Sequence, residues 1–290
     1  MDKKNILVTG SEGQLGTELR DLAGSTYNSK FYFASRVDLP IEDSLSLEKY
    51  FSENLPGYCI NCAAYTAVDK AESEATLAFK INATAVGNLA AICKKYGTCL
   101  IHISTDYVFN GNAYLPYKES DATDPVNLYG ATKLQGEELA LKNNDQTIVI
   151  RTSWLYSSHG NNFVKTMLRL MKERTSIGVV NDQFGNPTYA ADLAAAILQI
   201  IQNNDPKPGI YHYCNKGTIT WYELACAIKE YSGSNCTVKP VDTSGYPTPA
   251  KRPAYSALDT TKIEEQFDLN ISVWKESLER CIKRLGLEHS

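Results

Sequence analysis

The fold is decided near the start of the chain by the stretch Asn5-Ile6-Leu7-Val8-Thr9-Gly10-Ser11-Glu12-Gly13-Gln14-Leu15-Gly16. Its first five residues are mostly apolar and include β-branched members, which is typical of a buried strand. Three glycines follow at intervals of three, and a helical pattern continues beyond them. A strand, a glycine-rich turn and a helix in this order favour a dinucleotide-binding turn. We expect Gly10 to make the turn, Gly13 to admit a pyrophosphate and Gly16 to let the helix pack on the strand.

Beyond this stretch, apolar runs alternate with helical patterns. We expect strands at residues 30–35, 57–61, 99–103 and 147–150, with helices over 73–96 and 129–141. This alternation predicts an α/β fold with a Rossmann-type doubly wound parallel sheet. After Tyr156 the chain becomes more irregular and polar, which suggests a smaller α/β substrate-binding domain. We therefore predict a dinucleotide-binding domain from residues 1–155 and 186–213, and a substrate domain from residues 156–185 and 214–290.

The composition of the chain excludes several classes of protein. The chain has 290 residues and a formal net charge of −4, and 21% of its residues are charged. A near-balanced charge does not indicate a partner that is nucleic acid or a membrane surface. We see no apolar run near the ~20 residues of a membrane span and no signal peptide, so we expect a cytoplasmic protein. The eight cysteines, including the pair Cys59 and Cys62, are expected to be reduced thiols without a metal.

Three further segments are predicted to bind the cofactor. The helix that begins at Gln14 and Leu15 offers backbone N–H donors and a positive dipole end to phosphate. Ser35 and Arg36 stand where an acidic residue would bind a ribose 2′-hydroxyl. A hydroxyl and a cation there favour a 2′-phosphate, so we expect NADPH to be preferred and NADH to be accepted. We expect Asp38 and Leu39 to lie beside the adenine. Ala63 and Ala64 are small enough to let the cofactor pass close to the backbone.

A second motif, Tyr129-Gly130-Ala131-Thr132-Lys133, lies at the start of a predicted helix. A spacing of four places the phenol and the ammonium on one helical face, which is also the spacing of many surface pairs. A free phenol has a pKa of about 10, and a cation nearby lowers it, so we expect Lys133 to tune Tyr129 for acid catalysis. Thr105 follows the fourth strand, where ligands of an open α/β sheet bind. His102, inside that strand, is expected to be a core residue.

Together these features resemble the extended short-chain dehydrogenase/reductase superfamily. The closer similarity, over nearly the whole chain, is to the dTDP-4-dehydrorhamnose reductase family. The motifs that carry it are Cys62-Ala63-Ala64-Tyr65-Thr66-Ala67-Val68-Asp69-Lys70-Ala71-Glu72, Ser104-Thr105-Asp106-Tyr107-Val108-Phe109, Asn127-Leu128-Tyr129-Gly130-Ala131-Thr132-Lys133, Arg151-Thr152-Ser153-Trp154, Asn161-Asn162-Phe163, Asp182-Gln183-Phe184-Gly185-Asn186-Pro187-Thr188, and Arg252-Pro253 with Ser256, Leu258 and Asp259.

The resemblance implies an NAD(P)H-dependent reduction of the C4 keto group of dTDP-4-dehydro-6-deoxy-L-mannose to dTDP-L-rhamnose. It implies that Thr105 hydrogen-bonds the carbonyl oxygen, that Tyr129 protonates it, and that Lys133 holds the nicotinamide ribose. It implies that Arg252 pairs with the diphosphate. It adds Tyr65 and Thr66 to the cofactor-binding residues. The implied substrate-binding residues are Val68, Thr105, Asp106, Tyr107, Trp154, Asn162, Phe163, Gln183 and Arg252.

Two other classes remain open from the sequence. One is a non-catalytic subunit that resembles the regulatory subunit of methionine adenosyltransferase. Trp154 and the Arg252-to-Asp259 motif favour the sugar reductase over this class. The other is a nucleotide-sugar epimerase or dehydratase, which holds NAD tightly and regenerates it. Some relatives are similar in binding a divalent metal at a dimer interface, and Glu18 and Asp192 sit near such positions. A homodimer and Mg²⁺ are therefore left open, and no residue is assigned as a metal ligand.

Overall fold

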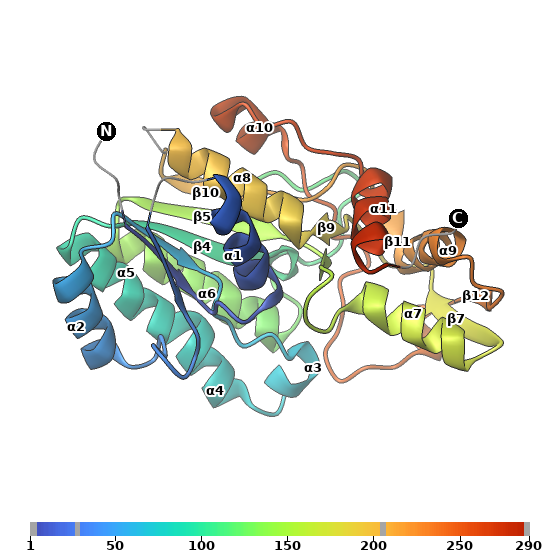
Figure 1. Cartoon of the computed structure of the whole chain (residues 1–290). Coiled ribbons are helices and arrows are strands. Elements are labelled where there is room, and N and C mark those ends of the chain that lie inside the picture. The colour runs from blue at the N-terminus through green and yellow to red at the C-terminus, as the bar shows by residue number, and fades with distance from the viewer. Residues whose placement is uncertain (1–4, 27–29, 204–206, 287–290) are drawn as a thin grey trace.

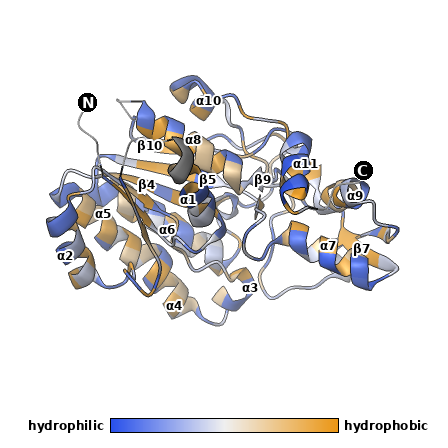
Figure 2. Ribbon diagram, in the orientation of Figure 1, coloured by the Kyte–Doolittle hydropathy of each residue, from blue (hydrophilic) through white to orange (hydrophobic). Residues whose placement is uncertain are grey.

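The computed structural model describes residues 5–26, 30–203 and 207–286, and the predictions that concern residues 1–4 and 287–290 lie outside these ranges. Figure 1 shows a large part built on a central sheet, and a smaller part beside it that holds α7, α9 and α11. The predicted α/β class is confirmed. Figure 2 shows the apolar residues concentrated on the strands and on the helix faces that cover them.

The central sheet has six strands, and every pairing within it is parallel. In spatial order the strands are β2 (Phe31–Ala34), β1 (Ile6–Thr9), β3 (Tyr58–Asn61), β4 (Cys99–Thr105), β5 (Thr147–Thr152) and β10 (Gly209–His212). The chain leaves β1 toward β2 and then returns to place β3 on the other side of β1. This reversal creates a crevice at the carboxyl ends of β1 and β3, the usual place for a ligand in an open α/β sheet.

Helices cover both faces of the sheet, because its strands carry apolar side chains on both faces and each face must be buried. One face is covered by α1 (Gln14–Thr26), α8 (Ala190–Gln202) and α10 (Thr261–Phe267), whose apolar residues share a core with the strands. The other is covered by α2 (Ser44–Asn54), α4 (Ala75–Phe79), the π-helical turn η1 (Lys80–Thr84), α5 (Ala85–Lys95) and α6 (Leu128–Asn143). The short elements α3 (Val68–Ala71) and the 3-10 turn η2 (Asp106–Val108) follow β3 and β4.

The smaller part has a separate apolar core, formed where three helices meet a two-stranded parallel sheet. The helices are α7 (Phe163–Glu173), α9 (Trp221–Ser232) and α11 (Trp274–Arg284), and the strands are β7 (Ser176–Val180) and β12 (Thr237–Val241). The remaining elements are β6 (Leu155–Tyr156), β8 (Phe184–Gly185), β9 (Thr188–Tyr189), β11 (Ile219–Thr220) and the 3-10 turn η3 (Thr243–Gly245). Because α10 packs on the core of the central sheet, the exact domain boundaries stay a prediction.

Two features differ from what the sequence suggested. The helix α2 was not predicted, although Asp43 caps it by accepting hydrogen bonds from the N–H groups of Leu45 and Ser46. The continuous helical stretch from Ala75 to Lys95 has the length and apolar composition of a membrane span, whereas no such run was expected. However, 61% of its most apolar window is buried inside the protein, which is the behaviour of a core helix.

Candidate active site

A cavity of about 830 Å³ lies at the carboxyl ends of the central strands. Gly10 follows β1, Ala63 follows β3, Thr105 ends β4 and Ser153 follows β5, and all four line the cavity. Residues from the smaller part, among them Phe163 and Trp221, close its other side. The cavity therefore spans the crevice at the sheet reversal and the junction between the two parts of the molecule.

The glycine-rich turn forms one end of this cavity. Gly10 has φ +65°, and a Cβ atom there would lie 2.6 Å from the backbone nitrogen of Ala63. A Cβ atom on Gly16 would lie 2.6 Å from the carbonyl oxygen of Gly10, so only glycine lets α1 approach the turn this closely. The N-terminus of α1 then points its free N–H groups at the cavity. This geometry fits a dinucleotide pyrophosphate.

Arg36, which is predicted to bind the 2′-phosphate, lies at the same end of the cavity, and its side chain is 70% exposed. Its guanidinium donates to the carboxylate of Glu42 over 3.1 Å, and Glu42 also lines the cavity. The hydroxyl of Ser35 accepts from the N–H groups of Val37 and Asp38, and Ser35 is not among the residues that line the cavity. The side chain of Ser35 and its backbone N–H, the latter over 3.0 Å, both hydrogen-bond the carboxyl of Asp38 and lower its pKa.

The start of α6 sets the position of Tyr129. Asn127 caps the helix by accepting from the N–H of Gly130 over 2.8 Å. A Cβ atom on Gly130 would lie 2.1 Å from the carbonyl oxygen of Tyr107, so glycine is needed for α6 to pack against η2. This packing places Tyr129 close enough to Thr105 for the threonine side chain to affect the pKa of the phenol.

Burial outweighs any nearby cation at Tyr129. Desolvation raises the pKa of this phenol to about 12, and the Thr105 side chain opposes the shift only partly. The expected lowering of this pKa by Lys133 concerns the protein with its cofactor bound, and it stays a prediction. Without a cofactor, Tyr129 is therefore fully protonated at neutral pH, which is the state that a proton donor requires.

Lys133 is buried beneath the cavity, one turn of α6 after Tyr129. Its ammonium group donates to the carbonyl oxygen of Ile103 over 2.6 Å and lies 3.4 Å from Nε2 of His102. Burial lowers the pKa of Lys133 to about 8, and the negative charge of Glu137 opposes this shift. Glu137 is itself paired with Arg151 over 2.7 Å and accepts a short hydrogen bond from Ser104.

A second acid lies beside Thr105. Asp106 is buried, and its Oδ1 accepts from the Thr105 hydroxyl over 3.0 Å, while its Oδ2 has no hydrogen-bond partner among the residues that the structure describes. Burial raises the pKa of this carboxyl to about 7. A buried and half-satisfied carboxyl that lines a cavity is suited to a hydroxyl group of a bound substrate.

An aromatic wall faces these polar groups. The rings of Trp154 and Trp221 are stacked, with centroids 3.6 Å apart and planes 11° apart, and Phe163 packs against Trp221 at 4.6 Å. Trp154 has φ +46°, an uncommon conformation for a bulky residue, and its ring lies against Gly185. A Cβ atom on Gly185 would approach that ring to 2.7 Å. A sugar ring could stack on this wall.

Most of the predicted site residues lie together in the cavity lining. Those that line it are Gly10, Gly13, Gln14, Leu15, Gly16, Arg36, Leu39, Ala63, Ala64, Thr66, Val68, Thr105, Asp106, Tyr129, Lys133, Trp154 and Phe163. Those outside the lining are Asp38, Tyr65, Tyr107, Asn162, Gln183 and Arg252.

Two of the residues outside the lining, Asn162 and Tyr107, contact residues that line the cavity, and a third, Tyr65, makes an exposed contact. Asn162 caps α7 and donates to the side chain of Gln14 over 2.9 Å, which ties the smaller part to the glycine-rich turn. Tyr107 packs edge-on against the ring of Tyr129 at 5.9 Å. Tyr65 donates its hydroxyl proton to Glu74 over 2.7 Å.

Two others outside the lining, Arg252 and Gln183, make contacts that the sequence did not suggest. The guanidinium of Arg252 binds both carboxylate oxygens of Asp69, one of them over 2.8 Å. The guanidinium is therefore already paired with Asp69, which follows Val68 in α3. Gln183 donates to the hydroxyl of Thr243 over 3.0 Å and holds two loops of the smaller part together.

Sequence reasoning missed several lining residues. Trp221 lies at the first position of α9, where Thr220 and Glu223 form a reciprocal capping box. That box was a readable signal for the helix start, but nothing in the sequence indicates that the indole reaches the Trp154 ring. The other missed lining residues include Glu42, Ser104, Thr152, Ser153, Gly160 and Asn161.

With the geometry established, the chain can be compared with known proteins. Residues 4–287 match the family model of the RmlD substrate binding domain. A dTDP-4-dehydrorhamnose reductase of Aggregatibacter actinomycetemcomitans is 40% identical over 286 residues, which cover 94% of this chain and 96% of that protein. This chain belongs to the dTDP-4-dehydrorhamnose reductase family.

Two solved structures of the reductase family share its architecture. The enzyme from Clostridium acetobutylicum superposes with a TM-score of 0.93 at 42% identity, over 97% of this chain and 99% of that one. The enzyme from Bacillus anthracis, solved in complex with NADP, superposes with a TM-score of 0.93 at 38% identity, with the same coverage. The family resemblance expected from the sequence motifs is thus confirmed over nearly the whole chain.

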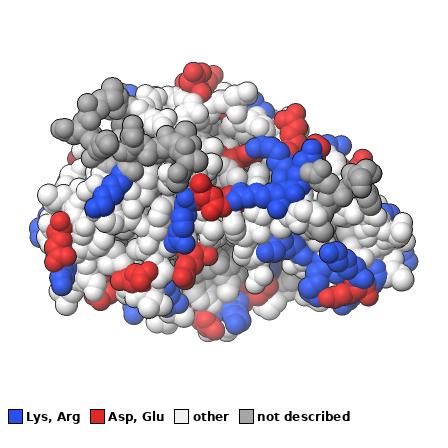
Figure 3. All heavy atoms as spheres, viewed as in Figure 1, with Lys and Arg blue, Asp and Glu red and all other residues white. Residues whose placement is uncertain are grey.

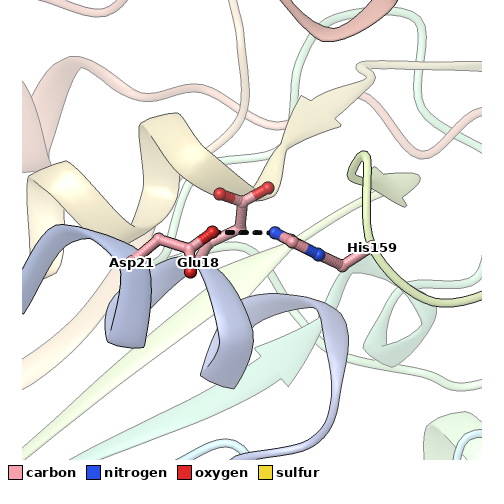
Figure 4. Close-up of side chains that lie close together, drawn as sticks. All are labelled: Glu18, Asp21 and His159. Atoms are coloured by element: carbon pink, nitrogen blue, oxygen red, sulfur yellow. Dashed lines mark hydrogen bonds and ion pairs between the residues drawn. The ribbon is translucent and has the colours of Figure 1, made fainter. Parts of the chain in front are cut away.

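The family resemblance left a divalent metal open near Glu18 and Asp192, and in this structure both carboxylates are paired with arginines. Glu18, Asp21 and His159 bring ligand atoms within 4.8 Å of one another (Figure 4). However, the guanidinium of Arg284 binds both carboxylates, Glu18 over 2.6 Å, and so supplies the positive charge itself. Asp192 lies elsewhere, paired with Arg280 over 2.8 Å.

Figure 3 shows Lys and Arg side chains gathered over α11, next to acidic side chains over α1. Both arginines that pair with Glu18 and Asp192 come from α11. This arrangement fits an internal ion-pair cluster better than a divalent metal site.

Proposed function

We propose that this chain uses NADPH to reduce the C4 keto group of dTDP-4-dehydro-6-deoxy-L-mannose, giving dTDP-L-rhamnose. The observation that carries the proposal is the arrangement of Thr105, Tyr129 and Lys133 at the carboxyl end of β4, inside the main cavity. The reductases that the chain resembles over nearly their full length support the same reaction. NADPH is favoured because a relative was solved with NADP and because Arg36 lies at the adenine end of the cavity.

The residues present fit a dinucleotide. The close approach at Gly10 and Gly16 leaves room for a pyrophosphate, and the start of α1 supplies N–H donors to it. The other residues that would hold the cofactor are Leu39, Ala63, Ala64, Thr66 and Lys133, all of which line the cavity. The reduced nicotinamide, when bound, supplies the hydride.

The protein residues then handle the carbonyl oxygen of the sugar. Thr105 donates a hydrogen bond that polarises the carbonyl, and Tyr129 transfers its phenolic proton to the oxygen as negative charge develops there. In the cofactor-free protein burial raises the pKa of Tyr129 to about 12, which is still below that of the sugar alcohol, so proton transfer to the developing alkoxide is favourable. A positioned proton donor contributes ~10²–10⁴-fold to the rate. Lys133 stabilises the phenolate left behind.

The sugar and nucleotide are expected to contact the opposite side of the cavity. Trp154, stacked on Trp221, offers a flat apolar face to the sugar ring, and Asp106 accepts from its hydroxyl groups. Val68 and Phe163 line the same side. Arg252 remains our candidate for the diphosphate, since its partner Asp69 is 40% exposed and the ion pair can open toward an incoming anion.

Loss of NADPH absorbance on incubation with the dTDP-4-keto-sugar tests the proposal. Turnover that requires the keto-sugar and yields dTDP-L-rhamnose supports it. A preparation that binds NADP(H) but consumes none with this substrate would disprove it. Copurified and firmly held NAD would instead favour the epimerase or dehydratase class, and absence of any turnover would favour the regulatory class.

A further inference from the structure

A buried row of polar side chains runs under the cavity, across three neighbouring strands, to Lys133. Thr9 of β1 donates to Oδ1 of Asn61 on β3 over 2.7 Å. Nδ2 of Asn61 lies 3.1 Å from Nδ1 of His102 on β4, and Nε2 of His102 lies 3.4 Å from the Lys133 nitrogen. Thr9, Asn61 and His102 are all fully buried, so water cannot supply alternative partners to them. The reaction proposed above does not use any of these three.

The orientation of the Asn61 amide is fixed by a backbone group. The N–H of Ala63 donates to Oδ1 of Asn61 over 3.2 Å. A backbone N–H can only donate, so the atom that faces it must be the amide oxygen rather than the amide nitrogen. The amide nitrogen of Asn61 therefore faces His102 and donates to Nδ1.

The tautomer of His102 follows from this orientation. Nδ1 accepts a hydrogen bond, so it carries no proton, and the single proton of a neutral imidazole must reside on Nε2. The imidazolium form is excluded by burial, which lowers the pKa of His102 well below its usual value, and by the donor at Nδ1. The Nε2–H group consequently points toward the nitrogen of Lys133.

An N–H group that faces an ammonium is repelled by it, whereas it can donate to the lone pair of a neutral amine. We propose that Asn61 and His102 are positioning residues that weaken the hold of Lys133 on its proton in the cofactor-free protein, so that cofactor binding draws a proton onto Lys133. Lys133 can still donate to the carbonyl of Ile103 as a neutral amine. This inference rests on the cofactor site of the proposed function.

Of the other influences on Lys133, some raise its pKa and others lower it. Glu137, one turn further along α6, favours the ammonium, but its charge is largely shared with Arg151 of β5. The thiol of Cys62, after β3, and the phenol of Tyr129 are neutral, because burial raises the pKa of each. Desolvation is the largest effect and lowers the pKa of Lys133 to about 8, which agrees with the direction set by His102.

The pH range follows from these directions. A bound cofactor brings negative phosphates and ribose hydroxyls that accept from an ammonium, so it raises the pKa of Lys133. Below about pH 8 Lys133 is already protonated in the free protein, and binding takes up little. Above about pH 8 the free protein holds the neutral amine, and binding takes up nearly one proton. Affinity for NADPH should then fall by up to about tenfold for each pH unit.

Calorimetric titration of the full chain with NADPH, at pH 7 and pH 9 in buffers of different ionisation enthalpy, measures this uptake directly. We expect well under half a proton at pH 7 and more than half a proton at pH 9. In Lys133→Met the uptake at pH 9 should disappear. If wild type binds NADPH at pH 9 without taking up a proton, the inference is wrong while the cofactor site stands. If NADPH does not bind at all, both fail.

Three buried variants separate the positioning role from a packing role. In Asn61→Asp the carboxylate requires a proton on Nδ1 of His102, so Nε2 becomes an acceptor and the uptake at pH 9 should fall by at least half. His102→Asn keeps an acceptor for Asn61 but removes the group that faces Lys133, and should have the same effect without adding a charge. Thr9→Val removes a hydroxyl but leaves the Ala63 contact, so its uptake should match wild type.

Thermal melting of each variant confirms that it is folded before titration. Equal uptake in wild type, Asn61→Asp and His102→Asn would show that these residues only pack the strands, and would overturn the inference. A fall in Thr9→Val as large as in the other two would do so as well.

Discussion

The two sides of the cavity are built in different ways. On the cofactor side, the groups that matter lie at the ends of strands and the starts of helices, as Gly10, Thr105 and Tyr129 do. On the proposed substrate side, Trp154 lines the cavity, whereas Arg252 and Gln183 lie outside its lining. All three lie on loops, and each is positioned by a partner distant in the sequence. Regular elements fix a side chain through local rules, whereas loops need specific long-range contacts. The first side should therefore lose chemistry when altered, and the second should lose binding.

The largest effect is expected on the cofactor side, from Tyr129→Phe. Loss of the proton donor should lower kcat by at least ~10²-fold, and NADPH affinity should change little because the phenolic hydroxyl is the only group removed. Steady-state kinetics with the dTDP-4-keto-sugar, together with a binding titration, measure both quantities. Near wild-type turnover would show that Tyr129 is not the proton donor. The proposed difference between the two sides of the cavity would then be wrong.

A smaller effect, on binding alone, is expected on the substrate side from Arg252→Ala. A charged hydrogen bond contributes roughly 1.5–3 kcal/mol, so KM for the dTDP-sugar should rise ~10–150-fold while kcat stays nearly constant. Asp69→Asn is the matched control, because it breaks the same ion pair but leaves the guanidinium free. If both substitutions raise KM equally, Arg252 serves only to hold Asp69 and the diphosphate is bound elsewhere.

A still smaller effect is expected at the adenine end of the cofactor side. Removal of an exposed contact between Arg36 and the phosphate should cost ~1–2 kcal/mol, so Arg36→Ala should lower the preference for NADPH over NADH by about tenfold. Glu42→Gln, which releases Arg36 from its carboxylate partner, should raise that preference a few-fold. The ratio of kcat/KM for the two cofactors measures both, and an unchanged ratio in each variant would show that Arg36 does not contact the phosphate.

The smallest effect is expected from metal removal. Because Arg284 neutralises Glu18 and Asp21, treatment with a chelator should leave activity within about twofold and the melting temperature unchanged. Activity assays and thermal melting before and after chelation test this. A marked loss that Mg²⁺ restores would mean that a cation binds at residues which this arrangement does not provide.

The same contrast explains what could be predicted from the sequence. The turn at Gly10 and the helical pair of Tyr129 and Lys133 are local patterns, so their places in the sheet and on α6 were predicted correctly. The extent to which burial raises the pKa of Tyr129 in the cofactor-free protein could not be predicted, because it depends on segments that only the fold brings together. The partner of Arg252 lies 183 positions away in the chain, and no spacing rule connects them. His102 was recognised as a core residue, but its contact with Lys133 depends on strand register.

The stacked pair of Trp154 and Trp221 also has an optical consequence. The chain contains three tryptophans, and the third, Trp274, is buried in the core of the smaller part. Two indoles with centroids 3.6 Å apart couple through their strong far-ultraviolet transitions, so together they produce a paired signal in far-ultraviolet circular dichroism that an isolated indole lacks. One ring of the pair is carried by the loop after β5 and the other by α9. The protein thus contains an intrinsic spectroscopic gauge of the separation between these two segments, which can be read without any attached label while ligands are added.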